Sequence, residues 1–158
     1  MDPESRHVAA CLRMSLRLRP KLVVSDASSA IAFYEAVFGA RVKKRFTMGD
    51  TTVFAELSLP SGDVLQLKDA DATDPAPGAS ASGVILDVLC EDPDAVAEAA
   101  LARGAEIVFP IRDQPYGSRQ GRIRDPFGHQ WIVGGNSTMS DEEVQAALDA
   151  WASSSGRS

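Results

Sequence analysis

The sequence predicts an α+β fold made of two tandem βαβββ modules that build a mixed sheet, followed by one further helix. The first observation behind this prediction is an internal repeat. Residues 23–31 align with residues 88–96 and residues 39–42 align with residues 104–107 at one constant offset. The offset then changes by one, so that residues 60–63 align with residues 126–129. The second observation is that each copy shows the hydrophobic pattern of a strand, a helix and three strands.

The first module is predicted to span residues 16–68. Its first strand, residues 16–24, alternates Leu16 and Leu18 with arginines. Asp26 is a suitable N-cap for the helix that follows, and Gly39 is suited to end it. Three strands are then expected near residues 41–46, 52–59 and 63–68, with a hairpin turn at residues 60–62.

The second module is predicted to span residues 83–134, after a linker rich in Asp, Ala, Pro, Gly and Ser. A strand is expected at residues 84–89. Asp92 as N-cap and Pro93 in the first turn indicate a helix start, and Gly104 indicates its end. The remaining strands are expected near residues 106–111, 121–124 and 130–133.

The C-terminal helix is predicted for residues 140–153, outside the repeat. Ser140 and Glu143 have the spacing of a capping box. An apolar stripe follows at helical spacing and comprises Val144, Ala147, Leu148 and Trp151. We expect residues 1–13 to be a disordered extension and residues 14–158 to form one domain, because only the latter carry a clear pattern.

Composition narrows the function. The net charge is −6. Between residues 46 and 110 the sequence has a dozen acidic residues and only two basic ones, Lys68 and Arg103. Such a chain is a poor nucleic-acid binder, and its general field favours a cationic ligand. The basic run at residues 43–45 is expected to be the solvated face of a strand. With no long apolar run and only two cysteines, we expect no membrane span and a cytoplasmic location.

Several local phrases resemble one known family. Residues 26–40 are similar to its first helix, and residues 113–119, Arg122, residues 125–129 and Trp131 are similar to its PhnB-like branch. The family is the vicinal-oxygen-chelate superfamily of the glyoxalase and bleomycin-resistance type. The resemblance implies a cupped mixed sheet around a small-molecule cavity. It leaves the activity open, since the superfamily includes lyases, epimerases, dioxygenases and non-catalytic antibiotic-binding proteins.

The resemblance also implies where a divalent metal would be held. Family enzymes take one ligand from the first and the last strand of each module. Carried over, these positions fall on Arg19, on Gln66, on Val84 or Ile85, and on Ile132. Among them only Gln66 offers a possible ligand atom, because arginine stays protonated and aliphatic side chains have no donor. We therefore expect no metal and no cofactor.

Candidate ligand-binding residues are read from the strand faces. Neighbouring strand residues point to opposite faces, so an inward Ile132 requires Trp131 to pack under the helices. His129 and Cys90 are expected to be structural. The residues expected to bind a ligand are Phe54, Glu56, Gln66, Tyr116 and Ile132.

The leading functional hypothesis is a metal-independent small-molecule binding protein that sequesters an antibiotic or a similar compound. The alternatives are a metal-dependent lyase, isomerase or dioxygenase with differently placed ligands, and a non-catalytic interaction scaffold. We also expect a homodimer, because each module leaves edge strands that a partner could cover. Whether the modules pair within one chain or between two chains stays open at this point.

Overall fold

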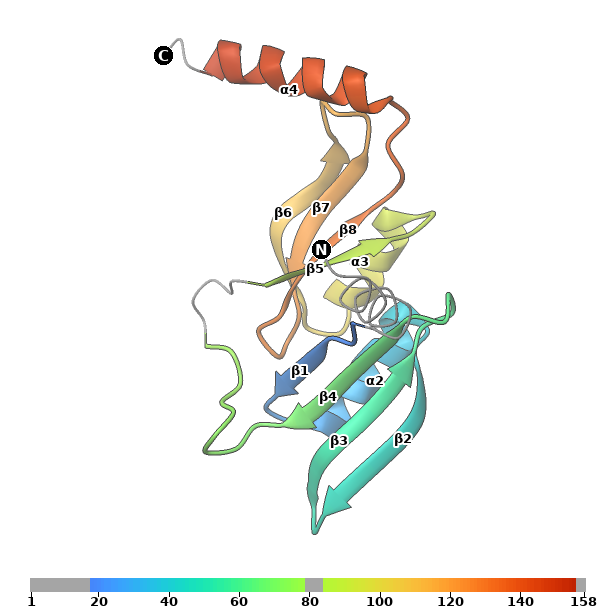
Figure 1. Ribbon diagram of the computed structural model, residues 1–158, viewed down its shortest axis with the longest axis vertical. Coiled ribbons are helices and arrows are strands. Elements are labelled where there is room, and N and C mark those ends of the chain that lie inside the picture. The colour runs from blue at the N-terminus through green and yellow to red at the C-terminus, as the bar shows by residue number, and fades with distance from the viewer. Residues whose placement is uncertain (1–17, 79–83, 156–158) are drawn as a thin grey trace, which may run out of the picture.

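A computed structural model describes residues 18–78 and 84–155 (Figure 1). The extension predicted for residues 1–13, Leu16 and part of the linker lie outside the described residues. The first module comprises β1 (Lys21–Val24), α2 (Ala27–Phe38), β2 (Arg41–Met48), β3 (Thr51–Ser58) and β4 (Val64–Asp69). Its strands form a four-stranded sheet in the order β1-β4-β3-β2, in which only the β1–β4 pair is parallel.

The second module repeats this topology. It comprises β5 (Ile85–Leu89), α3 (Pro93–Leu101), β6 (Glu106–Asp113), β7 (Arg119–Arg124) and β8 (Gln130–Gly134). Its sheet has the order β5-β8-β7-β6, again with one parallel pair, β5–β8. The prediction of tandem βαβββ modules is confirmed.

The predicted helix starts are confirmed, but the repeat aligns differently at its beginning. Asp26 accepts the backbone N–H groups of Ser28 and Ser29, and Asp92 accepts that of Ala95. Asp26 and Asp92 are therefore equivalent residues of the two modules. The predicted alignment had placed Asp26 opposite Glu91, so it was wrong by one residue here. Because α3 is shorter than α2, the offset falls back by one at the helix ends, where Gly39 and Gly104 both have positive φ. The predicted alignment held only after the helices.

The first strand is shorter than predicted. It begins at Lys21 rather than at residue 16, and Leu18 is 89% exposed. Residues 18–20, the described part of this segment, therefore do not form a half-buried strand. The other predicted strands differ from the observed bounds by two residues or fewer at each end.

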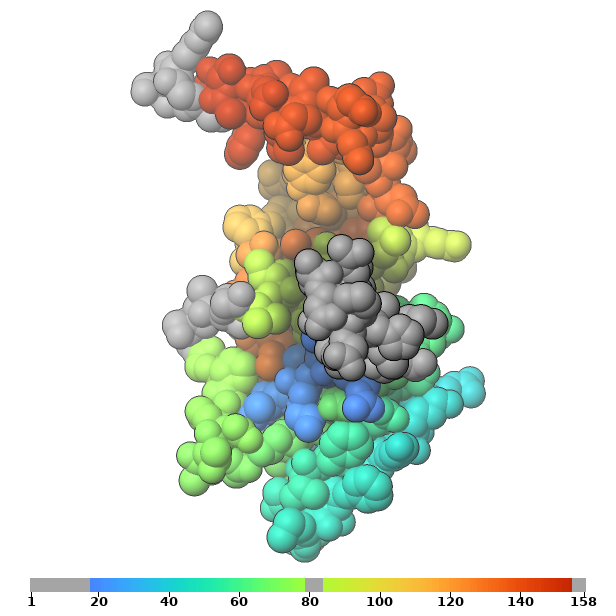
Figure 2. Space-filling view, in the orientation of Figure 1, coloured from blue at the N-terminus to red at the C-terminus, as the bar shows by residue number. Residues whose placement is uncertain are grey.

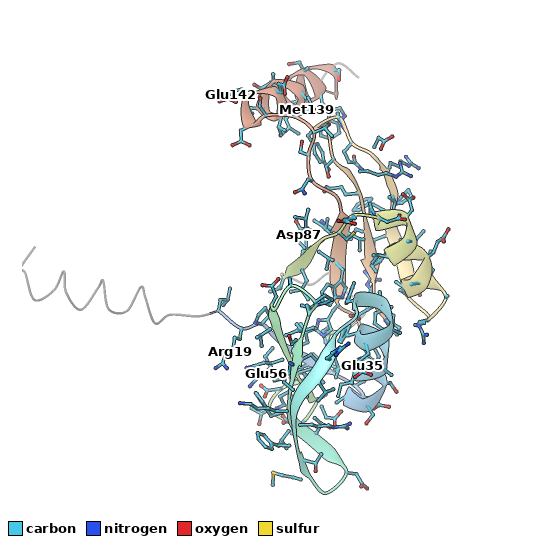
Figure 3. All side chains as sticks on the ribbon, turned by 90° about the vertical axis from the view of Figure 1, so that its right-hand side faces the viewer. Arg19, Glu35, Glu56, Asp87, Met139 and Glu142 are labelled. Carbon is cyan, nitrogen blue, oxygen red and sulfur yellow. The ribbon has the colours of Figure 1, made fainter. Side chains whose placement is uncertain are left out.

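Both modules contribute to one hydrophobic core. Leu22, Leu57 and Leu67 of the first sheet pack in the same cluster as Trp131 and Val133 of the second. Helices α2 and α3 lie against each other and cover the sheets on one side, while Arg19, Glu56 and Asp87 lie on the other side (Figure 3). The faces of the two sheets that α2 and α3 do not cover, called here the open faces, thus lie on the same side of the chain (Figure 3).

The molecule is elongated, with β2 at one end and α4 (Asp141–Ser155) at the other (Figures 1 and 2). The predicted capping box is present: the Ser140 hydroxyl accepts the Glu143 N–H at 3.2 Å, and the Glu143 carboxylate accepts the Ser140 N–H at 2.8 Å. In the apolar stripe, Val144 and Ala147 are half-buried, but Trp151 is 60% exposed. No helix within the described ranges is long and apolar enough to cross a membrane.

Candidate functional site

The side-chain register predicted for β8 is confirmed. Trp131 is 4% exposed, and its ring lies 4.7 Å from that of Phe38 and 5.6 Å from that of Tyr34, both on α2. Its neighbour Ile132 is half-buried and pairs with Asp87 on one side and Arg122 on the other. Ile132 therefore lies on the open face, as the alternation along a strand requires.

Three of the predicted site residues lie together on the open face of the first sheet. Glu56 in β3 and Gln66 in β4 are cross-strand partners, and Lys21 in β1 pairs with Gln66 from the other side. Phe54 lies one position further along this face, 5.9 Å from the ring of Phe46, with the Lys21 ammonium 5.2 Å above it. The structure thus brings Phe54, Glu56 and Gln66 onto one surface.

The donor set at the family's metal positions does not fit a divalent ion. Arg19, at the first position, forms an ion pair with Glu56 at 3.5 Å, so this guanidinium neutralises the carboxylate nearest to Gln66. By the corrected alignment the third position is Ile85, on the open face beside Asp87, and the fourth is Ile132. Within residues 18–78 and 84–155 no three His, Cys, Asp or Glu side chains cluster as a metal site would require.

The other two predicted residues, Tyr116 and Ile132, line one cavity of about 310 Å³ on the open face of the second sheet. Its floor is Ile132, and one wall is the ring of Phe109. The Tyr116 hydroxyl oxygen accepts a hydrogen bond from Gln120 at 2.7 Å, which leaves its own proton free to be donated. The remaining lining residues are Pro110, Arg112, Gln114, Gln120, Gly121 and Arg122.

Two arginines give this cavity its charge. Arg122 places its guanidinium carbon 5.5 Å from the centre of the Phe109 ring, and Nη1 is 3.5 Å from the Gln130 side chain. Its Nε is buried and has no hydrogen-bond partner. Arg112 is exposed. No acidic side chain is among the lining residues, so the local charge is the reverse of what the net charge suggested.

Backbone irregularity shapes the cavity wall. The β6–β7 register shifts between Ile107 and Phe109 and again between Phe109 and Arg112, around Pro110. Opposite this bulge, a Cβ on Gly121 would lie 2.6 Å from the carbonyl oxygen of Phe109. Glycine is therefore required here, and the bulged edge strand turns Phe109 toward Arg122.

A larger cavity of about 770 Å³ lies where β5 leads into α3, beside the β6–β7 hairpin. Its single arginine, Arg119, is clamped by Asp94 at 2.7 and 2.9 Å and approached by Asp113 at 3.3 Å. The ion pair lowers the pKa of Asp94. The cavity is also lined by Cys90, whose sulfur lies 3.6 Å from the Gly134 carbonyl oxygen. Burial raises the pKa of the Cys90 thiol, which disfavours the reactive thiolate. Arg119, the cation of this cavity, is thus already paired, and the remaining charged lining residue, Glu91, is acidic and exposed.

His129 has a structural position, as predicted. Its Nε2 lies 2.8 Å from the carbonyl oxygen of Val23, so it bridges the β7–β8 turn to the first module. From the sequence, Arg122 was named only among the residues that resemble the family, and Phe109 and Arg112 were not considered. The alternation of side chains along β7 could have indicated that Arg122 lies on the same face as Ile132. The bulge that brings Phe109 to the cavity has no comparably strong signal in the sequence.

The fold and this surface define a class: a paired-module α+β protein with an aromatic, polar cavity on the open side of its sheets. The family model of the Glyoxalase/Bleomycin resistance protein/Dioxygenase superfamily matches residues 7–133, and the chain belongs to this superfamily.

Individual relatives agree with this membership. An uncharacterized protein of Mycobacterium bovis is 33% identical over 141 residues, covering 84% of this chain and 92% of that protein. The crystal structure of TioX from Micromonospora sp. ML1 is 27% identical with a TM-score of 0.60 over 77% of this chain and 98% of that one. The fosfomycin resistance protein FosX of Listeria monocytogenes, solved with Mn(II) and sulfate, matches with a TM-score of 0.58 and 16% identity over 78% and 94% of the two chains. That last similarity concerns the fold alone.

Proposed function

We propose that this protein binds an organic small molecule on the open side of its sheets without a metal, and that it acts by sequestering the compound. The observation that carries the proposal is the cavity formed by Phe109, Tyr116, Arg122 and Ile132. It combines an apolar floor, an aromatic wall and a few convergent polar groups, which is the usual composition of a ligand site.

Metal independence is supported by the donor set. A lone amide oxygen at Gln66 is too weak to hold a divalent ion against water, and Arg19 occupies the Glu56 carboxylate. Catalysis without a metal would need a general base or nucleophile. Neither Cys90, with its raised pKa, nor His129, which is bonded to a backbone carbonyl, is suited to that task. Binding without chemistry is therefore favoured over the enzyme alternatives.

The test is a thermal-shift panel of planar natural products, antibiotics and divalent metals. A ligand at about one hundred times its Kd stabilises the folded state by about 2.7 kcal/mol. We expect organic compounds, and not Mn²⁺, Ni²⁺ or Zn²⁺, to raise the melting temperature. Stabilisation by a metal alone would favour the enzyme alternative, and a silent panel would favour the scaffold alternative.

The variant Ile132→Glu places a carboxylate on the cavity floor and should weaken binding of any panel ligand more than it weakens folding. Ile107→Glu is the matched control, because Ile107 is 50% exposed on β6 and does not line the cavity. Equal loss of binding in both variants would place the ligand elsewhere.

We also propose that the protein is a cytoplasmic homodimer. Strand β2 is exposed along its whole length and carries Arg41, Lys43 and Lys44 beside Phe46 and Met48. Helix α4, at the opposite end of the chain, has an acidic first turn at residues 141–143 and the exposed Trp151. A second copy in antiparallel orientation would place each acidic helix against the partner's basic strand, twice by symmetry.

A further inference from the structure

We infer that the ligand of the cavity is an organic anion, an oxyanion headgroup on a planar body, and that Arg122 recognises the headgroup. This inference rests on the proposed function and names the chemical class of its ligand. It departs from the cationic ligand that the acidic composition favours.

The first argument is the pairing of the arginines around β7. Arg119 has two carboxylates within 3.3 Å, and Arg124 has Glu106 at 4.0 Å. Arg122 lies between them in the same strand, and no described carboxylate lies within ion-pair distance of it. A half-buried guanidinium without a counter-charge is costly to desolvate, so such a position is well suited to receive an anion.

The second argument is the orientation of the guanidinium. The guanidinium carbon lies 5.5 Å from the centre of the Phe109 ring, and the contact to Gln130 engages only Nη1, at 3.5 Å. Nε remains buried without a partner. A carboxylate or phosphonate in the cavity would therefore accept from the terminal amino groups of the guanidinium, which carry its remaining donors.

The third argument is the lining as a whole. Arg112 adds a second guanidinium, and the Tyr116 hydroxyl has a proton to donate because its oxygen already accepts from Gln120. Asp87, Ile132 and Arg122 are cross-strand neighbours in β5, β8 and β7. The acidic residue of this set, Asp87, is therefore separated from Arg122 by Ile132, and it does not line the cavity. Phe109 and Ile132 supply the surfaces for a planar body.

The experiment compares three planar probes of nearly equal shape: benzoate, benzamide and benzamidine. Binding to the full chain is followed by two-dimensional NMR titration at millimolar concentration. We expect benzoate to bind about tenfold more tightly than neutral benzamide, the factor that a charge-assisted hydrogen bond typically contributes, and cationic benzamidine to bind most weakly. Phenylphosphonate, as a fourth probe, establishes which oxyanion headgroup the site prefers.

The variants are Arg122→Gln and, as a matched control, Arg124→Gln, which removes a guanidinium from the same strand outside this cavity. Arg122→Gln should abolish the preference for benzoate, and Arg124→Gln should keep it, with both variants checked for native circular dichroism. The inference is overturned if benzoate is silent, if benzamide or benzamidine binds as tightly, or if Arg124→Gln loses the preference equally. Binding of the neutral or cationic probe at this cavity would still leave the proposed function standing, whereas failure of both these probes and the thermal-shift panel would remove it.

Discussion

Asp125 is the residue on which the contact between the modules depends most directly. It is 3% exposed, in the turn between β7 and β8. One carboxylate oxygen accepts the Tyr34 hydroxyl at 2.7 Å and the Trp131 indole N–H at 2.8 Å. The other accepts the backbone N–H groups of Phe127 and His129. Because Tyr34 belongs to α2, this buried carboxylate ties the first module to the second.

Removing this carboxylate should be severe. Asp125→Ala leaves four buried or half-buried donors without their acceptor, and we expect the free energy of unfolding to fall by about 3–5 kcal/mol. The measurement is urea denaturation. Asp113→Ala is the control: that carboxylate belongs to an exposed ion pair, so its loss should cost less than about 1 kcal/mol. Similar losses for the two variants would contradict the bridging role.

Tyr34 gives a pH-dependent prediction at the same contact. Burial, followed by the Asp125 carboxylate, raises its pKa well above the ordinary value of 10.0. A raised folded-state pKa contributes stability that is fully present below the unfolded pKa and is lost as the pH rises above it. The chain has two tyrosines, so Tyr116→Phe leaves Tyr34 as the single reporter.

In that variant, tyrosinate absorbance during an alkaline titration should appear only together with loss of the circular dichroism signal. Tyr34→Phe, with Tyr116 retained, is the comparison and should unfold with a weaker dependence on pH in this alkaline range. Ionisation of Tyr34 near pH 10 in the folded protein would contradict the buried hydrogen bond.

Among the elements, α4 depends most on its own local signals. It has few contacts with the rest of the fold, and its capping box satisfies the first turn. Ser140→Ala should destabilise this helix by about 0.5–2 kcal/mol. Since the core does not depend on α4, we expect faster amide hydrogen exchange confined to residues 141–155 and an unchanged global unfolding transition. Ser153→Ala, near the other end of the helix, should leave exchange in the first turn unchanged; a large global loss in Ser140→Ala would show that α4 is integral to the core.

For the whole molecule, the distribution of charge predicts how two copies meet. We expect light scattering to report a dimer at micromolar concentration. Reversing one side, as in Lys43→Glu or Glu142→Lys, should weaken the dimer, because each like-charge contact then occurs twice. Mixing the two variants should restore the dimer, because both contacts in the heterodimer then place an acidic residue against a basic one. A monomeric wild type, or variants that dimerise as well as it does, would contradict this arrangement.

The sequence by itself determined the elements and their order. Asp26, Asp92 and the Ser140–Glu143 pair are local signals, since a cap and its helix lie within a few residues. The alternation around Trp131 and Ile132 likewise determined which side chain enters the core, because a strand has a period of two.

Only the tertiary structure decided which residues meet. Phe109 faces Arg122 because a bulge around Pro110 lies against Gly121. Among the described residues, Asp94 and Glu106 pair with Arg119 and Arg124, and no carboxylate pairs with Arg122. Net charge is a sum over the chain and indicated a cationic ligand, whereas the cavity responds to the few charges within reach. Contacts between residues distant in the chain depend on register and bulges, which local pattern does not specify.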